Sequence, residues 1–287
     1  MSEANGRALI FEMGPRDGLQ NEARPIPTAD KIRLVDLLSE AGFEKIETAS
    51  FVSPKWVPQM ADGAEVLAGV ARRPGARYTA LTPNLKGYER AKAAGADEVA
   101  IFGSASEGFS RANLNLGKAE ALEMFRPVAE AARRDGIPMR AYVSCVAECP
   151  FDGPTPPTAV AEAVEAMLAM GAYEVSLGDT IGRGTPEAVA AMLDAALDAA
   201  PASRLAGHYH DTGGRALENI DVSLEKGLRT FDAAVGGLGG CPYAPGAEGN
   251  VATERVAALL AERNFETGLD MERLAVAASF AKSLRSG

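Results

Sequence analysis

Residues 28–49, TADKIRLVDLLSEAGFEKIETA, hold the pattern that decides the fold. Apolar residues recur at helical spacing from Thr28 to Glu40, Gly42 follows, and Lys45–Ala49 is a run of strand length. A glycine just after a helix supplies the left-handed conformation that ends it. The stretch therefore predicts a helix, a glycine stop and a strand in direct succession, which is one α/β repeat.

The same unit recurs along the chain. Further predicted helices are stopped just before a strand by Gly95, Gly136, Gly171 and Gly227. The predicted strands are Ala8–Glu12, Lys45–Ala49, Arg77–Leu81, Glu98–Phe102, Met139–Val143, Tyr173–Leu177, Leu205–Tyr209 and Thr230–Val235. The predicted helices between them are Thr28–Glu40, Ala64–Ala71, Gly87–Ala94, Lys118–Arg134, Thr158–Met170, Pro186–Ala199 and Arg215–Glu225.

Eight strands with intervening helices predict an α/β protein with a (β/α)8 TIM barrel. An open doubly wound sheet usually has fewer strands and a glycine fingerprint after the first, and no GxGxxG or P-loop motif is present. Additional C-terminal helices, at about 251–283, are expected to close or extend the barrel. No linker or change of composition divides the 287 residues, so we expect one domain, residues 1–287, with a Gly-rich lid loop at about 236–250.

Charge and composition exclude several classes of protein. The chain has 29 Lys and Arg against 39 Asp and Glu, a formal charge of −10, which argues against nucleic-acid and membrane-surface binding. A small anionic substrate remains compatible, because a few local cations suffice to hold one. Three cysteines are too few for a disulfide framework, and we interpret Cys145 and Cys149 as structural. Without a targeting signal or an 18-residue apolar run, a cytoplasmic protein is expected.

Polar residues gather where the predicted strands end, and this is where TIM barrels carry their chemistry. His208 and His210, the only histidines, end the seventh strand two residues apart, so both rings face the same way. Asp17 follows the first strand, which lies beside the eighth when a barrel closes. With the two histidines it can form a mixed N/O set suited to Mg or Mn. The alternative is a pair of partly buried histidines that bond backbone carbonyls.

Three more charged residues follow or lie within the strands. Arg16 lies in a rigid GPRDG turn, where its guanidinium is suited to stabilising a developing oxyanion. The alternative is an ion pair with Asp17 on the protein surface. Glu47, inside the second strand, either works in catalysis or pairs with Arg16. Asp179 is interpreted as a metal-shell or substrate-binding residue, and its alternative is a structural carboxylate bonded to backbone amides.

The Gly-rich segment after the eighth strand carries Cys241 and Asn250. Glycine at this density suggests a lid, and a thiol delivered by a lid can give or take a proton. A buried, inert cysteine is the alternative. Asn250 is either a helix cap or an amide oxygen that completes the metal shell.

Seven segments, in order along nearly the whole chain, resemble the hydroxymethylglutaryl-CoA lyase family. Within them, the RDG and HxH motifs are shared by wider families of Claisen-type enzymes and aldolases, whereas VSPKWVPQMAD and GLGGCPYA are more specific. The segments are Phe11–Glu22, Glu47–Asp62, Leu81–Ala91, Tyr142–Pro150, Ser176–Pro186, His208–Thr212 and Gly237–Glu254.

The resemblance implies a metal-dependent barrel that cleaves 3-hydroxy-3-methylglutaryl-CoA to acetyl-CoA and acetoacetate, and it implies a homodimer. It assigns the divalent cation to the residues matching Asp17, His208, His210 and Asn250. It further implies that Arg16 stabilises the enolate, that Cys241 is the catalytic thiol of the lid, and that Glu47 and Asp179 are active-site carboxylates.

Two departures and three alternatives accompany this resemblance. Gly213 and Arg215 replace an aromatic residue and an amide that commonly follow the HxHDT segment, so the acyl pocket is expected to be larger. The alternatives are a condensing or aldolase relative, a lyase for a branched substrate such as the isohexenyl analogue, and a non-catalytic barrel. The last would be expected to lack one of the motif residues, and all of them are present.

Overall fold

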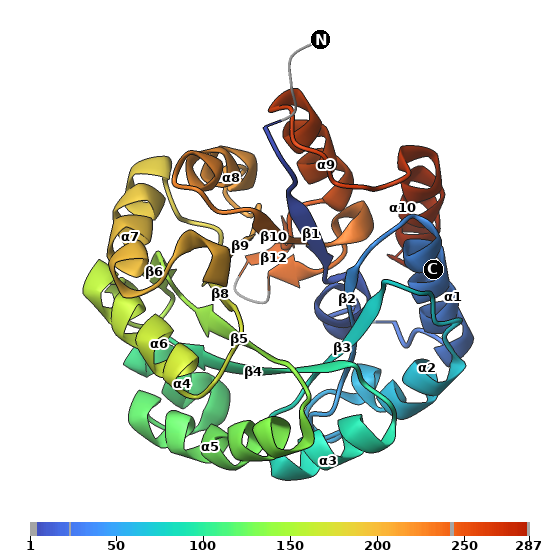
Figure 1. Cartoon of the computed structure of the whole chain (residues 1–287), viewed down its shortest axis with the longest axis horizontal. Coiled ribbons are helices and arrows are strands. Elements are labelled where there is room, and N and C mark those ends of the chain that lie inside the picture. Colours follow the sequence, from blue (N-terminus) through green and yellow to red (C-terminus); the bar gives the residue numbers. More distant parts are fainter. Residues whose placement is uncertain (1–4, 23, 242–243, 286–287) are drawn as a thin grey trace.

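The computed structural model describes residues 5–22, 24–241 and 244–285, with the backbone alone for residues 240–241 and 244–248. Eight parallel strands close into a barrel in the order β1-β10-β9-β8-β5-β4-β3-β2 (Figure 1). These strands are β1 (Leu9–Glu12), β2 (Lys45–Ser50), β3 (Arg77–Leu81), β4 (Glu98–Ser104), β5 (Met139–Ser144), β8 (Val175–Asp179), β9 (Leu205–Tyr209) and β10 (Thr230–Ala233). The predicted TIM barrel is therefore confirmed.

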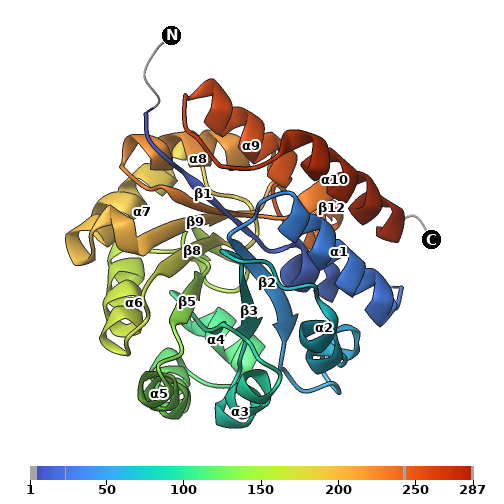
Figure 2. The same ribbon diagram turned by 45° about the vertical axis from the view of Figure 1, so that its right-hand side comes forward.

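Ten α-helices are found in the described residues, and most of them form a ring around the barrel (Figure 1). Helix α10 lies beside α9, packs against α1 and so closes the ring of helices (Figure 2). The helices are α1 (Thr28–Glu40), α2 (Gly63–Gly69), α3 (Leu85–Ala93), α4 (Glu107–Leu114), α5 (Lys118–Asp135), α6 (Pro157–Ala169), α7 (Pro186–Ala199), α8 (Ala216–Glu225), α9 (Thr253–Glu262) and α10 (Met271–Arg285). Over the described residues, none of them combines the length and apolarity that crossing a bilayer requires.

The glycine stops work as the sequence predicts. All five adopt positive φ, from 68° at Gly136 to 102° at Gly171, a region that side-chain-bearing residues rarely enter. Each helix therefore ends sharply and returns the chain to the next strand, which gives the barrel its repeat.

The apolar core has two layers. The larger layer lies between the strands and the helix ring, and a small cluster of Phe11, Met13, Leu81, Ala100 and Tyr142 fills part of the barrel interior. The rest of the interior is polar, and this is where the site described below is built.

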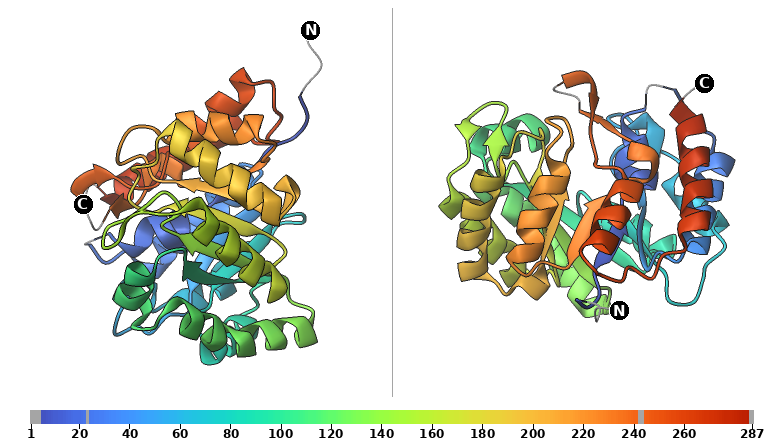
Figure 3. Two further views of the ribbon diagram at one scale, coloured as in Figure 1. Left: turned by 90° about the vertical axis from the view of Figure 1, so that its left-hand side faces the viewer. Right: turned by 90° about the horizontal axis from the view of Figure 1, so that it is seen from above.

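The structure differs from the sequence prediction mainly in its connections. Helix α4 and a hairpin of β6 (Glu148–Cys149) and β7 (Gly153–Pro154) were not predicted. The Gly-rich segment begins with a 3-10 turn (Val235–Gly237) and contains a second hairpin. That hairpin pairs β11 (Gly240–Cys241) with β12 (Ala244–Glu248), and both hairpins stand at the same end of the barrel (Figure 3, right).

Candidate metal centre and active site

The GPRDG sequence forms a single π-helical turn, Gly14–Gly18, directly after β1. The N–H groups of Arg16, Asp17 and Gly18 all donate to the carbonyl oxygen of Met13, at 3.2, 2.8 and 3.1 Å. A Cβ at Gly18 would lie only 2.7 Å from the Cβ of Leu238, so only glycine lets the turn approach the segment after β10 this closely. The turn holds Arg16 and Asp17 at the C-terminal end of the barrel.

Asp17, His208 and His210 come together as the sequence predicts. One ligand atom from each residue lies within 4.8 Å of the other two, and the imidazole centroids are 5.2 Å apart. The period of two along β9 turns Tyr209 the other way, where its hydroxyl lies 2.7 Å from the Ser223 hydroxyl on α8.

The protonation states of Asp17 and His210 suit a divalent cation. Burial opposes a charge on Asp17, but Arg16 and the two histidines more than compensate and lower the pKa of its carboxyl to about 2. Burial, together with the neighbouring His208, lowers the pKa of His210 to about 4, so its imidazole is neutral at pH 7. Metal ligands must be deprotonated, and an ionised carboxylate beside a neutral imidazole meets that condition. Burial lowers the pKa of the His208 imidazole, but Asp232 and Asp17 raise it above its usual value overall, so His208 has to lose its proton to bind a cation.

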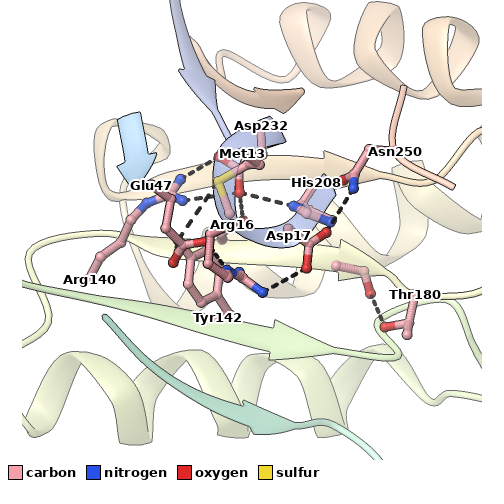
Figure 4. A network of polar contacts seen from close by, with 12 residues as sticks. Met13, Arg16, Asp17, Glu47, Arg140, Tyr142, Thr180, His208, Asp232 and Asn250 are labelled. Atoms are coloured by element: carbon pink, nitrogen blue, oxygen red, sulfur yellow. Dashed lines mark hydrogen bonds and ion pairs between the residues drawn. The ribbon is translucent and has the colours of Figure 1, made fainter. Parts of the chain in front are cut away.

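A carboxylate that sequence reasoning missed lies behind His208. Asp232 on β10 is 2% exposed, and its Oδ2 lies 3.1 Å from Nδ1 of His208 (Figure 4). Asp232 also accepts two hydrogen bonds from the buried Arg140, at 2.8 and 3.0 Å, and one from the Ser176 hydroxyl at 2.7 Å. A carboxylate in this place fixes the orientation of an imidazole ligand and leaves Nε2 free for a cation. The sequence offers one signal for Asp232, because it is an acidic residue inside a predicted strand, as Glu47 is.

Arg16 lies in a second ionic network that continues from the cluster (Figure 4). Its Nη1 donates to Oδ1 of Asp17 at 2.7 Å, and its Nε donates to Oε2 of Glu47. Glu47 is fully buried and also accepts the Tyr142 hydroxyl at 2.9 Å. Glu47 is thus paired with Arg16, and the geometry assigns it to holding the guanidinium in place.

Of the two residues predicted in the Gly-rich segment, the structure shows the side chain of Asn250 in contact with Asp17, whereas it describes only the backbone of Cys241. Asn250 pairs with His210 through the backbone, and its side-chain Nδ2 donates to Oδ2 of Asp17 at 2.8 Å. In this arrangement the amide nitrogen, not the oxygen expected of a ligand, faces Asp17. The thiol of Cys241 lies outside the described side chains, and its backbone forms β11 beside the loop that carries Asn250.

The structure does not bring Asp179 into the cluster. Its carboxylate is fully buried and accepts the backbone N–H groups of Gly184, at 2.8 Å, and Arg183, at 3.2 Å. The carboxylate is therefore engaged by its own loop, in agreement with the structural alternative. Burial raises the pKa of this group against the lowering effect of the two amides.

The expectation of an enlarged acyl pocket at Gly213 stays a prediction. Gly213 and Arg215 are both exposed in the loop after β9. A Cβ at Gly213 would lie 2.5 Å from the carbonyl oxygen of Gly182, so this backbone accepts glycine but no larger residue without a shift.

We expect Asp232→Asn to weaken the affinity for Mn²⁺ by about 10–100-fold, because the imidazole of His208 loses the carboxylate that orients it. Isothermal titration calorimetry with Mn²⁺ measures the effect, and circular dichroism checks the fold. The control is Asp194→Asn, since Asp194 is 63% exposed and pairs with Lys226 on the outer surface. An affinity equal to that of the control would contradict the role of Asp232.

A closed parallel barrel whose C-terminal mouth holds an aspartate and two histidines at ligand distance defines a TIM-barrel protein with a candidate metal centre. The sequence profile of the HMGL-like family matches residues 7–280. The chain belongs to this family, that of the hydroxymethylglutaryl-CoA lyases.

Individual relatives match over nearly the whole chain. A 3-hydroxy-3-isohexenylglutaryl-CoA/hydroxymethylglutaryl-CoA lyase of Pseudomonas aeruginosa is 56% identical, across 93% of this chain and 89% of its own length. The crystal structure of the HMG-CoA lyase from Brucella melitensis superposes with a TM-score of 0.97 at 62% identity, covering 100% of both chains. An HMG-CoA lyase from Acinetobacter baumannii, solved with coenzyme A and 3-methylmalate, gives a TM-score of 0.92 at 37% identity over 98% and 92% of the two chains.

Proposed function

We propose that this chain cleaves 3-hydroxy-3-methylglutaryl-CoA to acetyl-CoA and acetoacetate. The observation that carries the proposal is the Asp17–His208–His210 cluster beside the buried guanidinium of Arg16. The P. aeruginosa and B. melitensis relatives are named for this activity, and the A. baumannii relative was solved with coenzyme A. These findings support an acyl-CoA as the substrate.

The donor set favours Mg or Mn, held by Asp17, His208 and His210. Asn250 is the fourth ligand, which requires its amide to turn the oxygen toward the cluster. When bound, a divalent cation supplies a Lewis acid that lowers the pKa of the substrate's C3 hydroxyl. Soft-metal chemistry is disfavoured because no thiolate belongs to the cluster among the described side chains.

His208 and Asp17 are the two candidates for the proton acceptor. Nδ1 of His208 is engaged by Asp232, and the two oxygens of Asp17 accept hydrogen bonds from Arg16 and Asn250. We propose that one of these two residues removes the C3 hydroxyl proton.

Carbon–carbon cleavage follows loss of that proton. The C3–O electron pair forms the ketone of acetoacetate, the C2–C3 bond breaks, and its electrons pass to the thioester as an enolate. Arg16 stabilises the enolate oxygen through guanidinium N–H groups that neither Glu47 nor Asp17 uses. Cys241 donates a proton to the enolate carbon, which completes acetyl-CoA.

Metal removal tests the proposal directly. We expect purified protein treated with a chelator to release no acetoacetate from hydroxymethylglutaryl-CoA, and we expect Mg²⁺ or Mn²⁺ to restore turnover. An enzyme-coupled assay for acetoacetate measures the rate, and Ca²⁺ serves as a control cation, because it prefers more oxygen ligands at longer distances. Full turnover in the chelated protein would contradict a metal-dependent reaction.

The second candidate substrate is 3-hydroxy-3-isohexenylglutaryl-CoA, because the P. aeruginosa relative is named for both substrates. The ratio of kcat/KM for the two thioesters decides between them. An assay for condensation of a thioester with a keto acid tests the synthase alternative. We also propose a homodimer, which light scattering after size-exclusion chromatography checks.

A further inference from the structure

Glu12 is a buried acid that the proposed reaction does not use. It is the last residue of β1, it is 0% exposed, and its side chain lies on the outer face of the barrel, opposite that of Phe11. Its Oε1 accepts the N–H groups of Gly14, at 2.8 Å, and Val235, at 2.9 Å. Its Oε2 accepts the hydroxyl of Thr253 at 2.7 Å.

Each of these three partners belongs to a segment that adjoins a residue of the site. Gly14 is the first residue of the turn that carries Arg16 and Asp17. Val235 opens the Gly-rich segment that leads to Cys241, and Thr253 opens α9, three residues after Asn250. One carboxyl group therefore joins three segments that are remote from one another in the sequence.

The carboxyl group of Glu12 is closely packed against the turn that follows β1. A Cβ at Gly14 would lie 2.6 Å from Oε1 of Glu12 and 3.2 Å from a methyl group of Val235, so the carboxyl group fills the space beside the turn. On α9, Glu254 faces the same region and its carboxylate accepts the N–H of Gly236, which ties the Gly-rich segment to α9 a second time.

We propose that Glu12 is a positioning residue that fixes the Arg16–Asp17 turn relative to the Gly-rich segment and to the start of α9. The kinetic part of this inference rests on the proposed lyase function, whereas its metal-binding part does not. Glu12 touches none of the predicted metal ligands, so it acts only through the backbone of the segments that it joins.

The pattern of contacts also indicates the form in which Glu12 works. One oxygen receives both backbone amides and the other faces a hydroxyl, which a neutral carboxylic acid satisfies as well as a carboxylate does. Burial, reinforced slightly by Glu254, raises the pKa of Glu12 to about 8, against the lowering effect of its hydrogen bonds. Glutamine is therefore a close substitute at neutral pH, since its oxygen can accept both amides and its NH₂ group can donate to Thr253.

The test compares Glu12→Gln, Glu12→Ala and Thr253→Val with wild type at pH 7. For each, calorimetry gives the Mn²⁺ affinity, the acetoacetate assay gives kcat and KM, and circular dichroism gives the melting temperature. Val160→Ala is the control for lost stability alone, because Val160 is fully buried on α6, away from the three segments.

We expect Glu12→Gln to keep wild-type kcat and Mn²⁺ affinity. Glu12→Ala should lose at least about tenfold in both, with a smaller change in KM, as for other residues that orient ligands from behind. Val160→Ala should lower the melting temperature alone. If Glu12→Ala does not fold, Thr253→Val decides, and an intermediate loss of kcat and Mn²⁺ affinity supports the proposal.

Two results would overturn the inference. One is a Glu12→Ala or Thr253→Val protein with the kcat and Mn²⁺ affinity of the Val160→Ala control, and the other is a Glu12→Gln protein as impaired as Glu12→Ala. Failure of the proposed function is separate, because wild type would then release no acetoacetate while the Mn²⁺ affinities of the variants still test Glu12.

Discussion

Replacing Arg16 with Gln is expected to lower kcat by at least about 100-fold with little change in KM. Arg16 is only 6% exposed and its guanidinium is held by Glu47 and Asp17, so it is oriented before substrate arrives. Negative charge on the thioester oxygen develops as the C2–C3 bond breaks, and an interaction that strengthens only then raises kcat rather than affinity. Steady-state kinetics with hydroxymethylglutaryl-CoA measure both constants.

The same substitution also removes the partner of a buried acid. Glu47 is 0% exposed, and breaking a buried ion pair by removing one member typically costs about 3–5 kcal/mol. The double variant Arg16→Gln/Glu47→Gln removes both charges, so it should regain stability without regaining turnover. Arg126→Gln, on the exposed surface of α5, is the matched control for loss of an arginine. An Arg16→Gln protein that keeps more than half of the wild-type kcat would refute the role.

Asp17→Asn is expected to lower turnover by more than about 1000-fold. The carboxylate supplies the charged oxygen of the cluster and is one of the two candidate proton acceptors. A metal centre contributes several kcal/mol to transition-state stabilisation, where each 1.36 kcal/mol corresponds to tenfold in rate. Asp17 also lies between Arg16 and Asn250, and each of them donates a hydrogen bond to a different oxygen of its carboxylate. Asparagine has a single acceptor oxygen, so it cannot replace both contacts.

Titration with Mn²⁺ separates this prediction from that for Asp232. Excess Mn²⁺ should restore much of the turnover of Asp232→Asn, because the ligands themselves remain, whereas it should not restore that of Asp17→Asn. Asp194→Asn again serves as the control for loss of a surface carboxylate. Recovery of wild-type turnover by Asp17→Asn at high Mn²⁺ would show that Asp17 neither accepts the proton nor is essential to the centre.

Much of the site was predictable because local geometry fixes it. A strand alternates its side chains, so HYH had to place His208 and His210 on one face whatever surrounds them. The GPRDG sequence had to form a tight turn after the first strand, and barrel closure brings that strand beside the last, as the pairing of Leu9 with Thr230 shows. These predictions require only the periodicity of the strands and the rule that the strands of a TIM barrel lie side by side in chain order, with the first beside the last.

The residues that were missed or misjudged depend on contacts between distant segments. Asp232 and Arg140 lie inside strands, and nothing in either strand says that they meet across the barrel with bidentate geometry. Asp179 follows its strand as an active-site residue would, but positive φ at Gly182 turns the next two amides back onto its carboxylate. Glu12 ends a strand like any other, and its three partners come from three separate segments.

The repeat of strand and helix, the glycine stops and the shared face of His208 and His210 can be predicted from the amino-acid sequence alone. Those features follow from backbone preferences and from side-chain periodicity, which act over a few residues. Closure of the barrel determines that Arg140 pairs with Asp232, that Glu47 pairs with Arg16 as one of its two readings predicted, and which loop closes on Asp179. The reason is that pairing and burial are set when the barrel closes, and closure joins residues that no local pattern relates.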